Sequence, residues 1–169
     1  EGLLASIGVS PNSIDYILIT HEHIDHVRGA GVLSRRYDIP ILANEKTWTN
    51  MNKTIGEIKD KNIKIIDSDK DLILDDLGIH PFKIYHDAIE PVGYLIYYKK
   101  VKISIVTDTG WVDDKMKNKI KGSNLYLMES NHDVKMLKEG SYPWPLKQRV
   151  LSKVGHLSNI DAGEVLSEI

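Results

Sequence analysis

The feature that most constrains this chain is the run His21-Glu22-His23-Ile24-Asp25-His26, in which three imidazoles and an aspartate lie close together. The run directly follows the apolar segment Tyr16–Thr20, a predicted buried strand, and precedes a predicted helix at Gly31–Tyr37. In an extended chain alternate side chains point to the same side, so His21 and His23 project together. Burying these polar groups without partners would be costly, and a bound metal ion removes that cost. The run therefore predicts a metal site, and the alternative is an exposed polar loop with chance histidines.

The rest of the chain alternates between apolar strands and helices. Strand pairs come before and between helices, which predicts a mixed α/β domain, and 169 residues suffice for one domain with a sizeable core. The expected strands are Ile41–Ala43, Ile63–Ile66 and Leu125–Glu129, with hairpins formed by Leu72–Leu74 and Leu77–Ile84 and by Gly93–Tyr98 and Lys102–Thr107. The expected helices are Leu3–Ile7, Glu45–Met51, Asp113–Ile120, Asp133–Lys138, Leu146–Lys153 and Asp161–Ile169.

Composition excludes several classes of function. The chain has no cysteine, which removes disulfides, thiolate metal ligands and cysteine nucleophiles. No apolar run approaches the roughly 18–20 residues that a membrane span needs, so we expect no membrane partner. The formal net charge of -2 means that the chain as a whole does not indicate nucleic-acid binding.

The run of histidines resembles the His-x-His-x-Asp-His signature of the metallo-β-lactamase superfamily. That resemblance implies a four-layered αββα sandwich with metal ions at one edge, between the two sheets. It also implies that His21 and His23 bind a first metal ion and that Asp25 and His26 bind a second.

The same resemblance implies two further ligands, each in a loop after a strand. His86, in Tyr85-His86-Asp87-Ala88, fits the histidine, and its alternative is a surface loop residue. Asp108, in Val106-Thr107-Asp108-Thr109-Gly110, fits an aspartate that bridges the two metal ions. It ends an apolar strand, where a carboxylate has no packing reason to be, and its alternative is a turn or cap residue. His80 lies mid-strand with no motif around it, so we expect it to be structural.

A closer resemblance, to the YycJ/WalJ family, runs through nearly the whole chain. The family consists of cytoplasmic bacterial metallo-hydrolases related to RNase J and RNase Z, described as 5′→3′ exonucleases acting on DNA. The resemblance therefore implies a cytoplasmic nuclease with DNA as its partner. The matching blocks, in the family's order, are Ala43-Asn44-Glu45-Lys46-Thr47-Trp48, His86-Asp87-Ala88-x-Glu90-Pro91, Thr107-Asp108-Thr109-Gly110, Glu129-Ser130-Asn131-His132-Asp133 and Gly155-His156-Leu157-Ser158-Asn159.

The chain departs from that family at both ends. The family begins with two strands and an Asp-containing strand, and it ends with a strand that leads to a last metal-binding histidine. Neither end is present between Glu1 and Ile169. We therefore expect residues 1–169 to be an incomplete metallo-β-lactamase-like domain.

The expected mechanism uses two divalent metal ions, Zn²⁺ or Mn²⁺, to polarise a phosphoryl oxygen and activate water. Asp25 would orient or deprotonate the attacking water. The leaving oxygen needs a proton donor or a group that stabilises its charge, and the candidates are His156 and His132. Gly155-His156-Leu157-Ser158 resembles the histidine motif that contacts the scissile phosphate in RNase Z-like enzymes. The alternative for both histidines is a surface position.

The segment Lys135–Lys153 is a candidate surface for the nucleic-acid backbone. It carries five cations against the single acid Glu139, with Tyr142 and Trp144 among them. Cations interleaved with aromatic rings can hold phosphates and stack on a base. The alternative is a solvated helix face with Trp144 packed on the core.

Three classes of function remain open from the sequence. A nuclease is favoured by the family resemblance and by the basic segment. A hydrolase of small molecules, such as a cyclic phosphodiester, a thioester or a lactone, is the alternative. A non-catalytic binding module is opposed by the intact set of metal-binding side chains, because a lost activity would leave no need for all of them.

Overall fold

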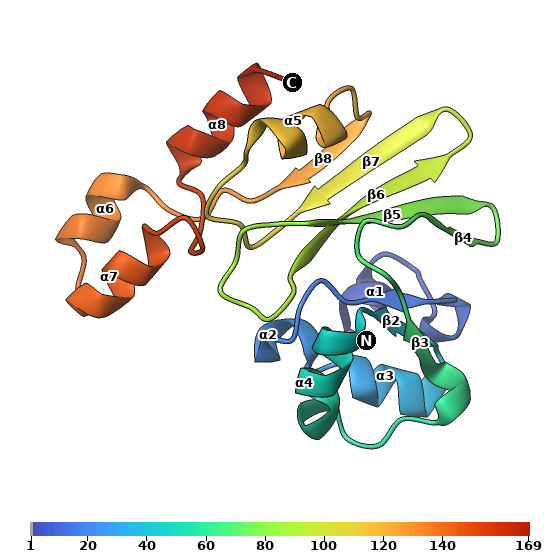
Figure 1. The fold of residues 1–169 in the computed structure, drawn as a ribbon. Helices are drawn as coiled ribbons and strands as arrows, with labels where there is room; N and C mark the ends of the chain where they lie inside the picture. The colour runs from blue at the N-terminus through green and yellow to red at the C-terminus, as the bar shows by residue number, and fades with distance from the viewer. Residues whose placement is uncertain (1) are drawn as a thin grey trace. The chain divides into compact units, whose positions relative to one another are not determined.

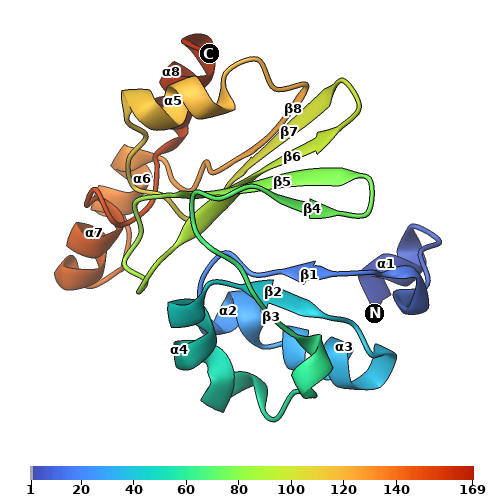
Figure 2. The same ribbon diagram turned by 45° about the vertical axis from the view of Figure 1, so that its right-hand side comes forward.

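The computed structural model describes residues 2–169, and they form two compact units. Unit 1 comprises the described residues up to Asp67 together with the short segment Ala88–Glu90. Unit 2 comprises Ser68–Asp87 and Pro91–Ile169. Each unit has its own sheet, which can be followed in Figures 1 and 2. The predicted mixed α/β fold with two sheets is confirmed.

Unit 1 is a small parallel sheet covered by helices. Its strands pair in the order β1-β2-β3, with Ile17 opposite Ile41 and Ile41 opposite Ile63. The strands and helices of unit 1 are α1 (Gly2–Ser6), η1 (Pro11–Ser13), β1 (Ile17–Leu18), α2 (Ile24–Val27), α3 (Ala30–Tyr37), β2 (Ile41–Ala43), α4 (Glu45–Ile55), η2 (Asp60–Asn62) and β3 (Ile63–Ile65).

The core of unit 1 fixes the loop that follows β1. Ile41 and Ala43 of β2 are fully buried against Trp48 and Met51 of α4. The Trp48 indole N–H also donates to the Lys64 carbonyl at 3.0 Å, which ties α4 to β3. The loop that carries the histidine run therefore leaves a packed strand and enters a packed helical layer.

Unit 2 is a five-stranded sheet in the order β4-β5-β6-β7-β8. The pairs are antiparallel except for β7 and β8, which run parallel. Its strands and helices are β4 (Leu72–Leu74), β5 (Leu77–Lys83), β6 (Val92–Tyr98), β7 (Val101–Val106), α5 (Asp114–Ile120), β8 (Leu125–Met128), α6 (Val134–Glu139), α7 (Trp144–Val150) and α8 (Asn159–Ser167).

Helices α5 and α8 cover one face of this sheet (Figure 1). Phe82 and Val106 of the sheet pack with Met116 and Ile120 of α5 and with Val165 of α8 in one buried cluster. Burial of large apolar side chains is the main stabilising contribution to such a unit, at roughly 1.5–3 kcal/mol for each. Because this face of the sheet is packed, the polar loops begin at the ends of the strands.

Three strands of unit 2 end at the same edge of the sheet. β5 and β7 are both antiparallel to β6, so they run in the same direction, and β8 runs parallel to β7. The loops after β5, β7 and β8 therefore leave from one edge, and they carry His86, Asp108 and Glu129. This topology brings together side chains that are far apart in the sequence.

Most expected elements are present, and α7 is the main correction. The expected helix Leu146–Lys153 begins earlier, at Trp144, and ends at Val150. Pro145 lies in its first turn, where proline is favoured. The helix ends early because the chain folds back, so that the His156 N–H donates to the Val150 carbonyl at 3.0 Å. Within residues 2–169, no helix is both long and apolar enough to cross a membrane.

Candidate active site

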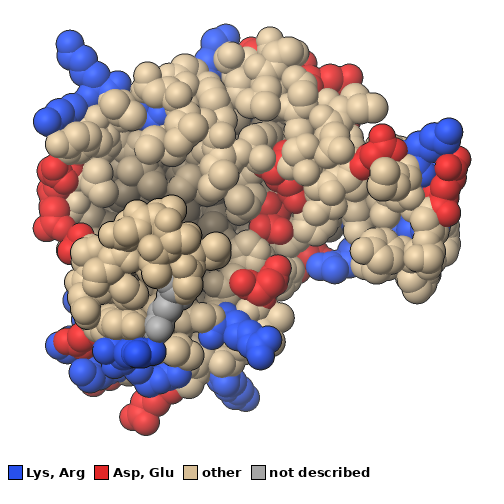
Figure 3. Space-filling model, turned by 180° about the vertical axis from the view of Figure 1, so that it is seen from behind, with Lys and Arg blue, Asp and Glu red and all other residues tan. Residues whose placement is uncertain are grey.

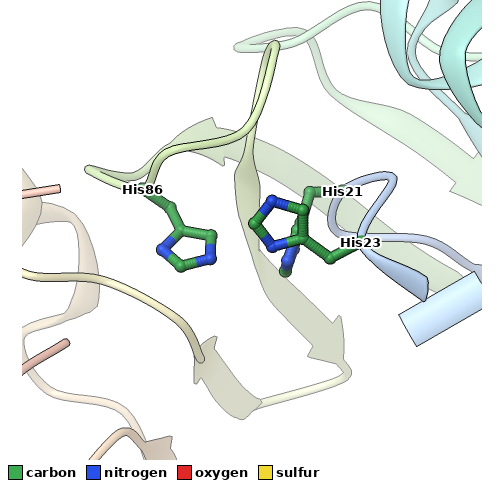
Figure 4. A group of neighbouring side chains, drawn as sticks. All are labelled: His21, His23 and His86. Atoms are coloured by element: carbon green, nitrogen blue, oxygen red, sulfur yellow. The ribbon is translucent and has the colours of Figure 1, made fainter. Parts of the chain in front are cut away.

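The histidine run of unit 1 forms a tight group of imidazoles in the loop after β1. His21 is completely buried. Its ring centroid lies 4.6 Å from that of His23 and 4.1 Å from that of His26. Figure 4 shows how the side chains of His21 and His23 project from this loop. The three imidazole rings of this loop therefore lie close to one another.

Thr20, the residue before the run, orients two of these rings. Its hydroxyl oxygen lies 3.0 Å from His21 Nδ1 and 3.3 Å from His26 Nδ1. A hydrogen-bond partner at one ring nitrogen fixes the direction in which the other ring nitrogen points. Metal-binding histidines are commonly oriented by such partners. Thr20 thus holds Nδ1 of His21 and His26 and turns their Nε2 atoms outward from the threonine. Thr20 was not among the site residues predicted from the sequence.

Asp25 differs from its neighbours because it is open to solvent. Its side chain is 76% exposed, and its Oδ2 lies 3.7 Å from His26 Nε2. Both residues lie in α2, with Asp25 in the first turn, where the helix dipole favours negative charge. Asp25 and His26 are therefore adjacent donors that can be reached by an ion from solution.

Unit 2 holds a second cluster, formed by His86, Asp108 and His156. One ligand atom from each of these residues lies within 4.8 Å of the others. The rings of His86 and His156 are 5.2 Å apart, and His156 Nδ1 lies 3.7 Å from Asp108 Oδ1. The structure therefore brings the two predicted ligands of unit 2, His86 and Asp108, together with the predicted catalytic residue His156.

The Gly155 backbone holds His86 in this cluster. His86 is buried, and its Nδ1 lies 3.2 Å from the Gly155 carbonyl oxygen. A Cβ on Gly155 would lie 2.1 Å from the Arg149 carbonyl oxygen and 2.3 Å from that of Val150, so only glycine fits. A donated Nδ1–H leaves Nε2 as the atom of His86 that can bind a metal.

Asp108 occupies an unusual backbone conformation directly after β7. Its φ of 51° lies in the left-handed region, which aspartate tolerates better than most residues. The turn directs the next backbone N–H, that of Thr109, to Glu129 Oε2 at 2.5 Å. The carboxylate of Asp108 is thereby fixed at the sheet edge beside His156.

Glu129 lies beside this cluster and was not assigned a role from the sequence. It follows β8, and its side chain is 7% exposed. One carboxylate oxygen accepts from Thr109 N–H, and the other lies 2.6 Å from His156 Nδ1. Glu129 therefore connects the Asp108 turn to the imidazole of His156. The sequence feature that could have predicted Glu129 is a carboxylate directly after an apolar strand, the same feature that predicted Asp108.

The electrostatics of the unit 2 cluster favour a protonated His156. The hydrogen bond that His156 donates to Glu129 raises the pKa of His156, with further contributions from the negative charges of Glu129 and Asp108, and burial opposes them. A carboxylate that accepts from Nδ1–H also holds the ring in one orientation. His156 can therefore present a proton at Nε2.

His132 lies near this cluster but has different surroundings. Burial lowers its pKa, and the positive charge of His156 adds to that effect. Neither ring nitrogen has a hydrogen-bond partner within residues 2–169. These surroundings favour the neutral form of the ring, which is not paired with a carboxylate in the way that His156 is.

The expected phosphate-binding segment Lys135–Lys153 is corrected at Lys147. This lysine is 8% exposed, and its ammonium donates to the carbonyls of Lys138 and Gly140 at 2.7 Å each. Those carbonyls end α6, so Lys147 caps a helix and is unavailable to phosphates. In the part of Figure 3 that carries α6 and α7, at the right, basic and acidic side chains lie side by side.

Two other cations of the segment also contact other side chains, whereas its two aromatic residues are exposed to solvent. The Arg149 guanidinium donates to both carboxylate oxygens of Asp87, at 2.5 and 3.0 Å. Lys153 Nζ lies 4.6 Å from the ring centroid of Trp111. Tyr142 and Trp144 are more than half exposed, so Trp144 is not packed on the core.

His80 takes part in a chain of polar contacts within unit 2. Its Nδ1 is 2.6 Å from Asp71 Oδ1, and its Nε2 is 2.8 Å from Lys119 Nζ. These contacts join the β4–β5 hairpin to α5. This arrangement agrees with the structural role that we expected for His80.

The side chains of both clusters fit divalent metal ions. Neutral imidazoles and carboxylates are the donors that zinc and manganese accept. His21 and His86 are buried and held at Nδ1, so each is fixed in orientation before any ion binds. The convergence of all six predicted ligands, from both units, stays a prediction.

The family follows from a match over almost the entire chain. The model for the β-lactamase superfamily domain matches residues 5–169. The chain therefore belongs to the β-lactamase superfamily. The metallo-β-lactamase fold protein YhfI of Bacillus subtilis has a TM-score of 0.71 at 18% identity, covering 98% of this chain and 64% of that one. This likeness confirms the metallo-β-lactamase fold.

Two relatives are much more similar in sequence. The exodeoxyribonuclease YycJ of Bacillus anthracis is 43% identical over 169 residues, which is 100% of this chain and 64% of that protein. The exodeoxyribonuclease WalJ of Streptococcus pneumoniae is 43% identical over 166 residues, covering 97% of this chain and 62% of that protein. The chain therefore spans less than two thirds of each relative. The resemblance to the YycJ/WalJ family is confirmed.

Proposed function

We propose that this chain carries the metal-binding side chains of a hydrolase that cleaves DNA from the 5′ end. The single observation that carries the proposal is the Asp108–His156–Glu129 arrangement, in which a candidate metal ligand lies beside a carboxylate-held imidazole. The 43% identity to proteins named exodeoxyribonucleases supports DNA as the substrate. The resemblance to the YycJ/WalJ family, whose members are described as cytoplasmic, supports a location in the cytoplasm.

We propose two divalent ions, Zn²⁺ or Mn²⁺, as the cofactors. When bound, they would supply Lewis-acid polarisation of a phosphoryl oxygen and activation of the attacking water. The residues assigned to hold them are His21, His23, Asp25, His26, His86 and Asp108. Support comes from the donor chemistry of each cluster and from the outer partners, Thr20 and Gly155, that orient the imidazoles.

His156 is assigned to the leaving group. Glu129 holds His156 at Nδ1, so Nε2 is the ring position that donates a proton to the departing oxygen of the sugar. The raised pKa keeps more of this imidazole protonated near neutral pH. Glu129 acts as a positioning residue, because it contacts the ring and the Thr109 N–H on the metal-ligand turn.

Asp25 is assigned to the attacking water, as its exposed carboxylate can orient that water or accept its proton. His132 is the other candidate for the leaving group. We prefer His156, because His132 has no carboxylate partner within residues 2–169 and its pKa is lowered.

The experiment that tests this function compares substrates on the full-length protein with added Zn²⁺ or Mn²⁺. DNA oligonucleotides labelled at the 5′ or 3′ end are incubated beside single- and double-stranded RNA and bis(p-nitrophenyl) phosphate. The proposal expects metal-dependent release of 5′ nucleotides from DNA. Hydrolysis of the small phosphodiester with intact DNA and RNA would instead assign a small-molecule hydrolase.

A further inference from the structure

A pocket in unit 2 is lined by residues that adjoin the Glu129–His156 pair along the chain. It has a volume of about 500 Å³ and lies where the chain passes from Asn131 into α6. Its walls include His132, Met136, Leu137, Tyr142 and the amides of Asn131 and Asn159. The volume is within the range of pockets that bind small organic molecules, roughly 300–1,000 Å³.

Two backbone segments carry both the pair and the pocket. The Asn131 N–H donates to the Leu157 carbonyl at 3.0 Å, and the Asn159 N–H donates to the His132 carbonyl at 2.9 Å. Glu129 lies shortly before Asn131 on one segment, and His156 lies directly before Leu157 on the other. The pocket is therefore rigidly linked to the proposed proton donor.

The pocket wall suits a neutral, planar group. Met136 and Tyr142 are 74% and 58% exposed, so they offer polarisable and aromatic faces to an occupant. Among residues 2–169, no Lys or Arg lines the pocket. Asp133, which carries a carboxylate, is one of the lining residues. A phosphate would meet no positive charge there, whereas the two amides can donate to and accept from a heteroaromatic edge.

His132 is an additional reason to expect an occupant. Both of its ring nitrogens are buried without a hydrogen-bond partner within residues 2–169, and buried polar groups are nearly always paired. The torsion that turns an imidazole ring is soft. A small rotation would therefore bring a neutral donor and acceptor to a ligand in the pocket.

We propose that this pocket binds one nucleobase of the substrate, with the base stacked on Tyr142 and its edge held by Asn131, Asn159 and His132. The inference rests on the proposed function for its choice of ligand. It gives the nuclease a base-binding subsite beside the leaving-group histidine, and it assigns His132 to that subsite.

The test is direct binding without metal, so it is independent of catalysis. The full-length protein, labelled with ¹³C-methyl methionine and kept in a chelator, is titrated with deoxyadenosine and with thymidine. Deoxyribose 5-phosphate and inorganic phosphate serve as probes without a base. The Met136 methyl resonance, assigned with Met136→Leu, should move saturably with the nucleosides, and the buried Met51 of unit 1 should not move.

Matched variants identify the stacking residue. Tyr142→Ala should weaken nucleoside binding about tenfold, because one base–aromatic stack contributes on that order. Tyr142→Phe should retain it, as should Trp144→Ala, an exposed aromatic residue outside the pocket wall. Absence of a Met136 shift, an equal shift with phosphate alone, or unchanged binding in Tyr142→Ala would overturn the inference. Metal-dependent DNA cleavage with no nucleoside binding would leave the proposed function standing and remove the subsite alone.

Discussion

His156 Nδ1 lies 2.6 Å from Glu129 Oε1, and this contact joins two segments that are widely separated in the sequence. The contact raises the pKa of His156. A histidine that donates a proton is active in its protonated form, so activity falls as the pH rises through its pKa. If His156 is the proton donor that we propose, the pair extends activity toward higher pH.

Replacing Glu129 by glutamine should move the alkaline limb of the pH–activity profile to lower pH. The amide keeps the shape of the side chain but removes the negative charge that raises the pKa of His156. The measurement is kcat for DNA hydrolysis across pH at saturating metal. Ser130→Ala is the control, since its hydroxyl contacts Asn159 rather than His156. An alkaline limb that stays in place would remove Glu129 from the control of His156.

Replacing His156 by alanine separates a proton donor from a metal ligand. If His156 serves the leaving group, bound metal should remain complete while turnover falls about 10²–10⁴-fold, the usual contribution of a positioned acid. Both quantities are measured on one preparation, by elemental analysis and by DNA cleavage. Loss of one metal equivalent would make His156 a ligand, and unchanged turnover would exclude it from the mechanism.

Replacing Lys147 by alanine should affect stability rather than DNA binding. The buried ammonium donates to two helix-end carbonyls, so its loss should lower the free energy of unfolding by about 1–3 kcal/mol. Lys138→Ala is a matched control, because Lys138 contributes its backbone carbonyl to the same contact. The salt dependence of DNA binding should be the same in Lys147→Ala and the wild type. A flatter dependence would restore Lys147 to the phosphate-binding surface.

Asp38 should contribute stability that depends on pH. The hydrogen bond from Lys61 lowers its pKa far below the ordinary value of 3.8, with support from Asn62 and Lys59. A carboxyl with a depressed pKa stabilises the fold above its unfolded pKa, and this stabilisation is lost as the pH falls toward the folded pKa.

The difference in unfolding free energy between wild type and Asp38→Asn should therefore be largest above about pH 4–5 and shrink in more acidic solution. Chemical unfolding at several pH values measures it. Asp60→Asn, at an exposed carboxylate in η2, is the comparison. A difference that is constant across pH would contradict the assigned role of Asp38.

The parts of the site that could be predicted from sequence are those with a local signal. The histidine run lies on one loop after β1, and Asp108 directly follows an apolar strand. Both could therefore be predicted from the residues next to them in the sequence. The Glu129–His156 pair could not be predicted, because it depends on the parallel register of β7 and β8 and on the tight turn at Gly155. Both are long-range properties of the folded chain.

In the basic segment Lys135–Lys153, the sequence suggested a role for Lys147 that the structure does not support. Lys147 has the sequence context of a solvated helix face, and periodicity alone cannot show that its ammonium turns inward to cap α6. Long cationic side chains bury their stems readily, so their positions in the sequence say little about where their charges lie.

The central claim is that the histidine loop of unit 1 and the Asp108 cluster of unit 2 both supply ligands to a pair of divalent ions. The most direct measurement is the metal content of the purified full-length protein, compared with that of His21→Ala and Asp108→Asn, each checked for folding by circular dichroism. We expect two equivalents of metal in the wild type and a loss in each variant, with loss of DNA cleavage. A folded wild type that binds no divalent metal, or variants that both retain two equivalents, would contradict it.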